Sequence, residues 1–159
     1  MGIEIERKFL VRRLPADLDR RSGAAIRQGY LIATETGIEL RIRQKKETFY
    51  QTVKMGAGVA RTEIEIELNR DQFQQLWPFT AGRRVTKTRF TLPVGTHTAE
   101  LDRFEGDLQG LTLVEVEFDA LADSAAFDPP DWFGREVTED ERYKNQHLAV
   151  HGIPDPRPT

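Results

Sequence analysis

Apolar and charged residues alternate with period two in several segments of the chain, which is the pattern of β-strands with one apolar and one polar face. The first such segment, residues 3–10, places Glu4, Glu6 and Lys8 on one face and aliphatic or aromatic side chains on the other. A polar turn near residues 45–48 predicts a hairpin. The same alternation predicts strands over residues 40–43, 50–54, 62–68, 84–92, 98–104 and 111–118, and a further strand is expected over 29–33.

Helices are predicted between and after some of these strands. The segment 71–77 has apolar residues at helical spacing and is entered from Asn69, which suits an N-cap. Thr138 and Glu141 have the spacing of a capping box, so we expect a helix that opens there and runs to Gly152. Shorter helices are predicted over residues 15–21 and 121–127.

The length and composition are typical of one globular domain. The chain has 159 residues, of which 38% are hydrophobic, and no repeat or linker divides it. At this length roughly 70% of the surface of the unfolded chain can be buried on folding. We expect a single domain over residues 1–152 and a flexible, proline-rich tail over 153–159, which lacks apolar content. Gly56-Ala57-Gly58 is interpreted as a hairpin tip.

Composition excludes several functional classes. The chain has no cysteine, which rules out disulfides, zinc fingers, iron–sulfur clusters and a catalytic thiol. Its formal net charge of −3 argues against a general nucleic-acid binder. The first ten residues are too charged for a signal peptide, and no uncharged stretch approaches about 18 residues. We expect a cytoplasmic protein without a nucleic-acid or membrane partner.

Charged side chains are grouped by sign within each predicted strand. Residues at i and i+2 lie roughly 7 Å apart, so two like charges repel by about 2 kcal/mol at an effective dielectric near 20. A solvated face would gain from mixed signs, so the grouping indicates another purpose. The groups are Glu4 with Glu6, Arg41 with Arg43, Glu63 with Glu65 and Glu67, Lys87 with Arg89, Glu100 with Asp102, and Glu115 with Glu117.

Two arrangements of these strands remain open at this point. An open antiparallel sheet would leave the charged faces in water. If about eight strands close into a barrel with the helices outside, the charged side chains converge on one axis and line a cavity. Carboxylates in such a cavity need divalent cations, and Arg and Lys side chains need a compact polyanion such as a chain of phosphates.

The segment Glu4-Ile5-Glu6-Arg7-Lys8 resembles the ExExK signature of the CYTH superfamily, the triphosphate tunnel metalloenzymes. The other charged groups follow in the order of that family, up to Arg142-Tyr143-Lys144-Asn145, so the resemblance extends over nearly the whole chain. It implies an α+β fold built on a closed, eight-stranded antiparallel β-barrel, the triphosphate tunnel, with helices packed outside. This agrees with the closed arrangement above.

The resemblance also implies roles for individual residues. The family's ligands for Mg²⁺ or Mn²⁺ correspond to Glu4, Glu6, Glu115 and Glu117, with Asp102 as a helper. The expected phosphate ligands are Lys8, Arg41, Arg43, Lys54, Arg61, Lys87, Arg89 and Lys144. The residues expected to take part in catalysis are Lys8, Glu65 and Glu63. For Glu63 and Glu65, service as counter-charges to the basic strands is an equally good interpretation.

The activity implied is metal-dependent hydrolysis of a phosphoanhydride, with inorganic tripolyphosphate giving pyrophosphate and orthophosphate. Thiamine triphosphatase and class IV adenylate cyclase are alternatives within the same family. A polyphosphate- or nucleotide-binding module without turnover is the alternative from another class. The expected partner is a small-molecule triphosphate, and a homodimer is left open.

Overall fold

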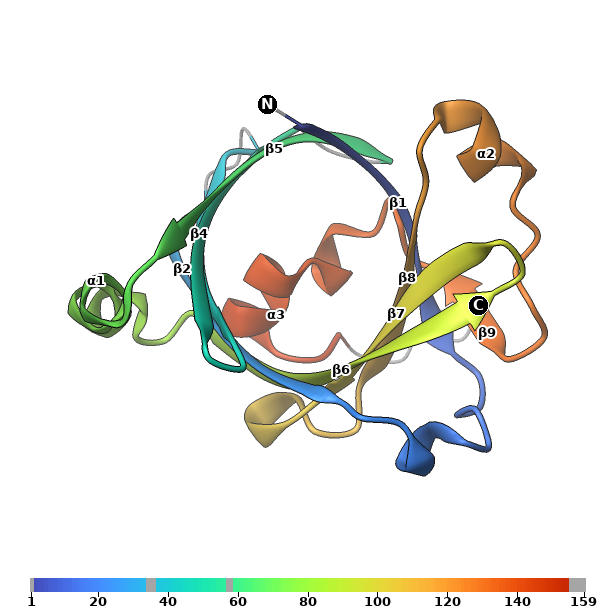
Figure 1. The fold of residues 1–159 in the computed structure, drawn as a ribbon, viewed down its shortest axis with the longest axis horizontal. Helices are drawn as coiled ribbons and strands as arrows, with labels where there is room; N and C mark the ends of the chain where they lie inside the picture. The colour runs from blue at the N-terminus through green and yellow to red at the C-terminus, as the bar shows by residue number, and fades with distance from the viewer. Residues whose placement is uncertain (1, 34–36, 57–58, 155–159) are drawn as a thin grey trace.

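Eight antiparallel strands curve into a closed barrel (Figure 1). The structure is a computed structural model, and it describes residues 2–33, 37–56 and 59–154. Around the barrel the strands follow the order β5-β4-β3-β2-β6-β7-β8-β1, and pairing of Gly2–Ile5 with 60–63 closes the ring. The strands are β1 (Gly2–Val11), β2 (Ala24–Ala33), β3 (Glu39–Lys45), β4 (Thr48–Met55), β5 (Ala60–Leu68), β6 (Arg84–Val94), β7 (His97–Phe104) and β8 (Thr112–Glu117). The predicted closed barrel is confirmed.

A ninth strand, β9 (Phe133–Glu136), was not predicted from the sequence. It pairs with the second half of β1, and the register of the pairing is irregular between Phe9 and Val11. β9 has four residues, among them a glycine, and is too short to show a clear alternation. Strand β1 therefore pairs with β8, β5 and β9, and its residues are fixed from both edges.

Two helices pack against the outer surface of the barrel (Figure 1). Helix α1 (Arg70–Leu76) places Phe73 against Phe49 of β4, with ring centroids 4.9 Å apart. Its N-cap is Asn69, whose side chain forms a capping box with Gln72, so this helix start is confirmed. Helix α2 (Leu121–Ala126) also forms where it was expected and lies beside β1. The segment 15–21 forms only a short 3₁₀ helix, Leu18–Arg20.

The third helix, α3 (Asn145–His151), lies across one end of the barrel, as Figure 1 shows. Its Leu148 is 2% exposed and belongs to a buried cluster with Val85, Phe104 and Leu113. These apolar residues continue the inner faces of the strands beyond the charged positions. They close this end of the barrel and form what we call the floor of the cavity.

The prediction of one helix from Thr138 to Gly152 is wrong. The Thr138 hydroxyl oxygen accepts a hydrogen bond from the backbone N–H of Lys8 at 3.0 Å and therefore does not cap a helix. The segment forms a 3₁₀ helix, Glu141–Tyr143, and then α3, and Lys144 between them is extended. Although apolar residues of this segment have helical spacing, its first residues are hydrogen-bonded to Lys8 of β1 instead of forming a helix.

Other expectations concern residues at the margins of the described ranges. Ala57 and Gly58 of the predicted hairpin tip, and residues 155–159 of the predicted tail, lie outside the described residues. The division into residues 1–152 and a tail stays a prediction. None of the helices in the described part of the chain is long and apolar enough to cross a membrane.

Candidate active site

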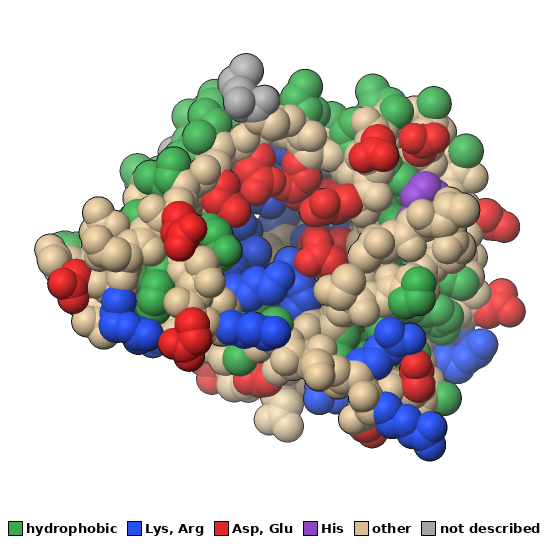
Figure 2. Space-filling model, in the orientation of Figure 1, with side chains coloured by type: hydrophobic (Ala, Val, Ile, Leu, Met, Phe, Trp, Pro, Cys, Tyr) green, Lys and Arg blue, Asp and Glu red, His purple; other side chains and the backbone are tan. Residues whose placement is uncertain are grey.

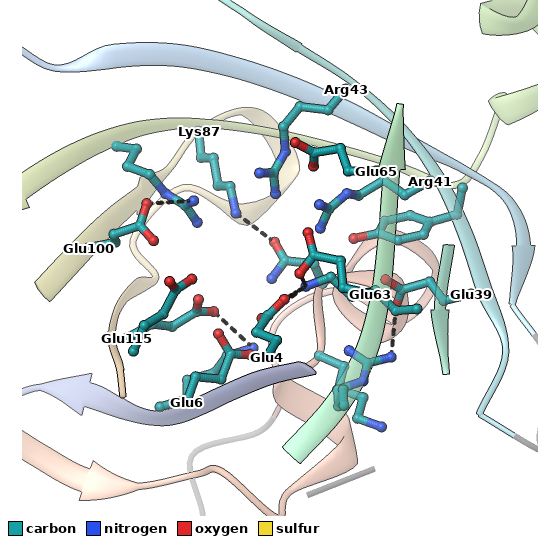
Figure 3. Close-up of a pocket in the computed structure, with 18 residues that line it drawn as sticks. Glu4, Glu6, Glu39, Arg41, Arg43, Glu63, Glu65, Lys87, Glu100 and Glu115 are labelled. Carbon is teal, nitrogen blue, oxygen red and sulfur yellow. Dashed lines mark hydrogen bonds and ion pairs between the residues drawn. The ribbon is translucent and has the colours of Figure 1, made fainter. Parts of the chain in front are cut away.

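The inward-facing residues of the barrel strands surround a charged cavity (Figure 3). Its volume is about 90 Å³, whereas one water needs roughly 10–15 Å³. The lining contains eight carboxylates and eight cationic side chains. The lining residues are Glu4, Glu6, Lys8, Tyr30, Glu39, Arg41, Arg43, Lys54, Arg61, Glu63, Glu65, Lys87, Arg89, Glu100, Glu115, Glu117, Lys144 and Asn145.

Strand pairing explains how like charges can follow one another along a strand. Lys8 lies opposite Glu115, and Lys54 lies opposite Glu63, so at these positions opposite charges face each other across the sheet. Figure 2 shows the result on the scale of the cavity, with carboxylates gathered along one side of the hollow and Lys and Arg side chains along the other. The cavity therefore offers a site for cations beside a site for anions.

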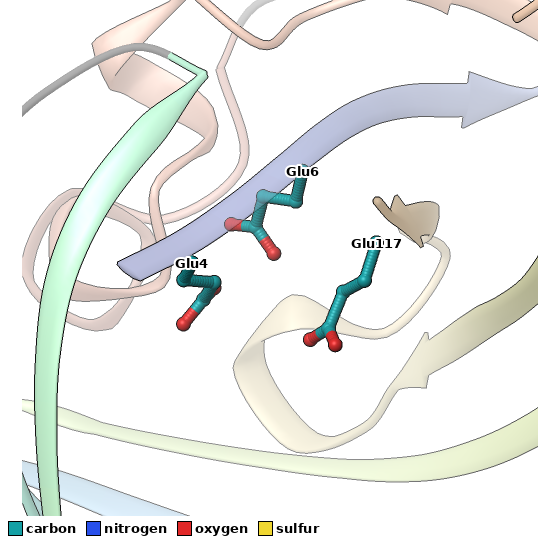
Figure 4. A group of neighbouring side chains, drawn as sticks. All are labelled: Glu4, Glu6 and Glu117. Atoms are coloured by element: carbon teal, nitrogen blue, oxygen red, sulfur yellow. The ribbon is translucent and has the colours of Figure 1, made fainter. Parts of the chain in front are cut away.

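The acidic side contains a group of carboxylates without a cation between them. Glu6 lies directly opposite Glu117, and oxygens of Glu4, Glu6 and Glu117 lie within 4.8 Å of one another (Figure 4). Burial and the neighbouring Glu115 and Glu4 raise the pKa of Glu6 well above its ordinary value. Burial and Glu100 raise the pKa of Glu117. A hard divalent cation with oxygen ligands would relieve this repulsion, so the chemistry of these residues fits such a cation.

Glu4 connects this acidic group to the basic residues. Lys54 Nζ lies 3.1 Å from both carboxylate oxygens of Glu4. Burial alone would raise the pKa of Glu4, but the charge of Lys54 and the hydrogen bonds with Glu6 and Lys54 together outweigh it, and the net shift is downward. Burial and the nearby Arg41 lower the pKa of Lys54. Glu4 can therefore act as a ligand that stays ionised.

On the basic side, a buried carboxylate holds two cations in place. The Asp102 carboxylate accepts hydrogen bonds from Arg89 Nε at 2.7 Å and from Arg89 Nη2 at 2.8 Å. Its Oδ2 also lies 2.7 Å from Lys87 Nζ. Despite burial, these cations lower the pKa of Asp102 to about 2. Asp102 is 2% exposed and does not line the cavity, so here it positions Arg89 and Lys87.

For several cationic side chains of the cavity, burial is only partly compensated by the neighbouring groups. Burial lowers the pKa of Lys87 to about 7 in spite of Asp102, and burial with the neighbouring Arg41 lowers the pKa of Arg43 to about 9. Arg41 Nε and Arg61 Nη2 are buried and have no hydrogen-bond partner among the described residues. Unpaired buried donors cost free energy, so this side of the cavity is suited to an anionic ligand that accepts from them.

The deepest part of the cavity connects the strands to α3. Lys8 Nζ lies 3.4 Å from Glu115 Oε1 and donates to the backbone oxygen of Tyr143 at 3.2 Å. Lys87 Nζ donates to Asn145 Oδ1 at 3.1 Å. Lys144 also lines the cavity, and its ammonium lies 2.9 Å from Glu141 Oε2. The segment before and within α3 therefore sets the position of two lysines at the floor.

Of the fifteen site residues predicted from the sequence, fourteen line this one cavity and Asp102 lies behind it. Their individual roles stay predictions. Four lining residues were not among them: Tyr30, Glu39, Glu100 and Asn145. Glu39 stands two positions before Arg41, so extending the period-two pattern by one step would have found it. Asn145 follows Lys144 and reaches the cavity only because α3 covers the floor.

Comparison with known proteins places this chain among others of similar length. The model of the CYTH domain matches residues 2–147. An inorganic triphosphatase of Nitrosomonas europaea is 50% identical over 149 residues, which cover 92% of this chain and 97% of the relative. An inorganic triphosphatase of Acetivibrio thermocellus is 35% identical over 151 residues, or 94% of both chains. The crystal structure of the inorganic triphosphatase NE1496 has a TM-score of 0.71 and 45% identity, covering 97% and 99%.

Proposed function

Because this chain belongs to the CYTH domain family, we propose that it is an inorganic triphosphatase that hydrolyses tripolyphosphate to pyrophosphate and orthophosphate. The observation that carries this proposal is the cavity, in which buried guanidinium nitrogens without a hydrogen-bond acceptor face a carboxylate cluster suited to a divalent metal. A small polyanion that binds together with metal matches both halves.

The basic side would bind and orient the substrate. Arg41 and Arg61 offer buried donors that phosphate oxygens would accept from, and Arg43 adds a third guanidinium. Lys54, Lys87, Arg89 and Lys144 add further positive charge. Lys8, whose ammonium lies 3.4 Å from Glu115 Oε1, would stabilise charge on a bound phosphate.

Mg²⁺ or Mn²⁺ would be held by Glu4, Glu6 and Glu117, with Glu115 beside them, and when bound it would polarise phosphate oxygens and activate water. The water oxygen forms a bond to the terminal phosphorus, the bridging P–O bond breaks, and pyrophosphate leaves. Glu65 is our candidate to accept the water's proton, because it lines the cavity and its Oε2 accepts a hydrogen bond from Thr52 at 3.0 Å. Glu63 is the second candidate, 4.0 Å from Lys54.

The activity is tested by offering tripolyphosphate, thiamine triphosphate and ATP, each with Mg²⁺, Mn²⁺ or EDTA. We expect metal-dependent release of orthophosphate, fastest from tripolyphosphate. Release of cAMP with pyrophosphate would show that the protein is a cyclase. Binding of a triphosphate without any product would show that it is a binding module. Equal rates in EDTA would refute the metal requirement.

A substitution at one carboxylate tests metal binding without loss of folding stability. Glu6→Gln should lower kcat/KM by at least about tenfold and raise the Mg²⁺ concentration needed for half-maximal activity. Because burial and carboxylate neighbours disfavour the ionised form of Glu6, the variant should be no less stable than the wild type. The control is Glu139→Gln, an exposed carboxylate outside the cavity, which should keep wild-type activity. Full activity of Glu6→Gln at low Mg²⁺ would contradict the assignment.

A further inference from the structure

Two histidines of α3 lie beside each other, outside the charged cavity. His147 and His151 are four residues apart, which places their side chains on the same face of the helix. Their ring centroids are 4.2 Å apart, and the ring planes are inclined by 37° to each other. Neither histidine lines the cavity, although Lys144 and Asn145 of the same segment do. We call these two residues the histidine pair.

One ring nitrogen of the pair has no partner in the protein. His147 Nδ1 is shielded from water and forms no hydrogen bond with any of the described residues. A polar atom that has lost water without gaining a partner costs free energy. A neutral imidazole has a free lone pair on one of its two nitrogens, and this lone pair binds metal ions. A metal ion bound at His147 Nδ1 would therefore remove the cost.

Two carboxylates act on His147 through their charges, but both are already paired with cations. Asp140 Oδ2 accepts a hydrogen bond from Arg142 Nη2 at 2.7 Å, and Glu141 Oε2 lies 2.9 Å from Lys144 Nζ. Within the described ranges, no carboxylate joins the two histidines to form a group of three metal ligands. The histidine pair therefore offers two imidazole nitrogens, and water would fill the other positions around a bound ion.

Imidazole nitrogens select a different class of ion from the carboxylates of the cavity. Mg²⁺ prefers oxygen ligands, whereas imidazole suits Zn²⁺, Ni²⁺ and Cu²⁺. The place of the pair in the helix also favours a cation. His151 lies in the last turn of α3, where carbonyl groups without an intrahelical partner give the helix end a partial negative charge. The ligand type and the helix end thus favour the same kind of ion.

We propose that the histidine pair binds a late first-row transition-metal ion, Zn²⁺, Ni²⁺ or Cu²⁺, through one nitrogen of each ring. This site is separate from the carboxylate cluster of the cavity, and it does not rest on the proposed function. The ion would link His147 to His151 across one turn and so stabilise α3. The same helix carries Leu148 of the floor and Asn145, which accepts a hydrogen bond from Lys87. Binding of the ion would therefore hold the cover of the floor in place.

The test measures Ni²⁺ binding by calorimetry on protein without a histidine tag, in excess Mg²⁺ so that the hard ion occupies the carboxylate cluster. The wild type should bind Ni²⁺ at a single site. His151→Gln, at an exposed position, should weaken this binding at least about tenfold, since loss of an outer-shell partner alone costs roughly 10–100-fold. The control, His97→Gln, removes an imidazole from β7 and should bind Ni²⁺ like the wild type. Glu6→Gln should also keep this binding.

The melting temperature gives a second measurement. Ni²⁺ should raise it in the wild type and in His97→Gln but not in His151→Gln, because an ion that binds only the folded state stabilises that state. Equal Ni²⁺ affinity of the wild type and His151→Gln would overturn the proposal, and so would a wild type that binds no Ni²⁺ in excess Mg²⁺. Loss of Ni²⁺ binding in Glu6→Gln would overturn it in favour of the cavity. If no triphosphate is hydrolysed the proposed function fails, but Ni²⁺ binding that depends on His151 would still support this site.

Discussion

Lys87 shows the conflict between stability and binding at the level of a single residue. Its side chain is buried, its ammonium lies 2.7 Å from Asp102 Oδ2, and its pKa is still lowered to about 7. Burying a cation costs free energy that one carboxylate, shared with Arg89, does not fully return. A phosphate group would supply the missing negative charge. We interpret Lys87 as a residue that serves phosphate binding and lowers the free energy of unfolding.

This interpretation gives a pH dependence of stability. Between pH 7 and the ordinary lysine pKa of 10.5, the unfolded chain holds more protons at this position than the folded protein does. The free energy of unfolding should therefore rise with pH in this window, by about 1.4 kcal/mol per unit at most. In Lys87→Met this contribution is absent. Urea unfolding at pH 7.0 and pH 9.5 should show a rise at least about 2 kcal/mol smaller in the variant than in the wild type.

The control for this experiment is Lys46→Asn, which removes an exposed lysine. It should keep the pH dependence of the wild type. If Lys87→Met and the wild type gain the same stability between the two pH values, Lys87 is not held in the folded protein with a lowered pKa.

At the level of elements, α1 and α3 differ in what they cover. Helix α1 packs on the outer surface of the barrel through Phe73, and none of its residues lines the charged cavity. Helix α3 covers the floor through Leu148 and brings Asn145 to Lys87. Loss of packing at α1 should therefore affect stability alone, whereas loss of packing at α3 should also displace cavity residues.

Two matched substitutions test this difference. Leu148→Ala removes floor packing, and Leu68→Ala removes the same atoms from the cluster under α1. Each should lower the free energy of unfolding by about 2–5 kcal/mol. Only Leu148→Ala should lower kcat/KM for tripolyphosphate, by at least about tenfold, when both are assayed well below their melting temperatures. Equal activity of the two variants would show that α3 does not position the site.

At the level of the whole molecule, barrel closure gathers charges that would otherwise be dispersed in water. The acidic cluster and the buried guanidinium nitrogens of Arg41 and Arg61 remain incompletely compensated by the protein itself. Ligands that bind only the folded state stabilise it by mass action, by about 2.7 kcal/mol at a hundred times Kd. The barrel should therefore gain stability when its ligands bind.

We expect Mg²⁺ and a triphosphate to raise the stability of the barrel together. A catalytically impaired Glu65→Gln variant avoids turnover. Its melting temperature should rise more with Mg²⁺ and tripolyphosphate together than the sum of the two rises measured with each ligand alone. In Glu6→Gln the contribution of Mg²⁺ should be lost, while that of tripolyphosphate persists. Additive shifts in Glu65→Gln would show that metal and phosphate do not share one cavity.

The sequence determined the eight barrel strands, their inward faces and nearly all cavity residues, because period-two alternation and sign grouping are local properties that a strand must express. It did not determine what each charge meets across the sheet. Glu117 and Asp102 follow the same alternation, but Glu117 faces Glu6, whereas Asp102 lies between Arg89 and Lys87. Likewise, helical spacing after Thr138 could not show that the Thr138 hydroxyl would accept a hydrogen bond from the backbone of β1. These contacts depend on which strands pair and on how the segment with α3 covers the end of the barrel, and only the tertiary structure decides both.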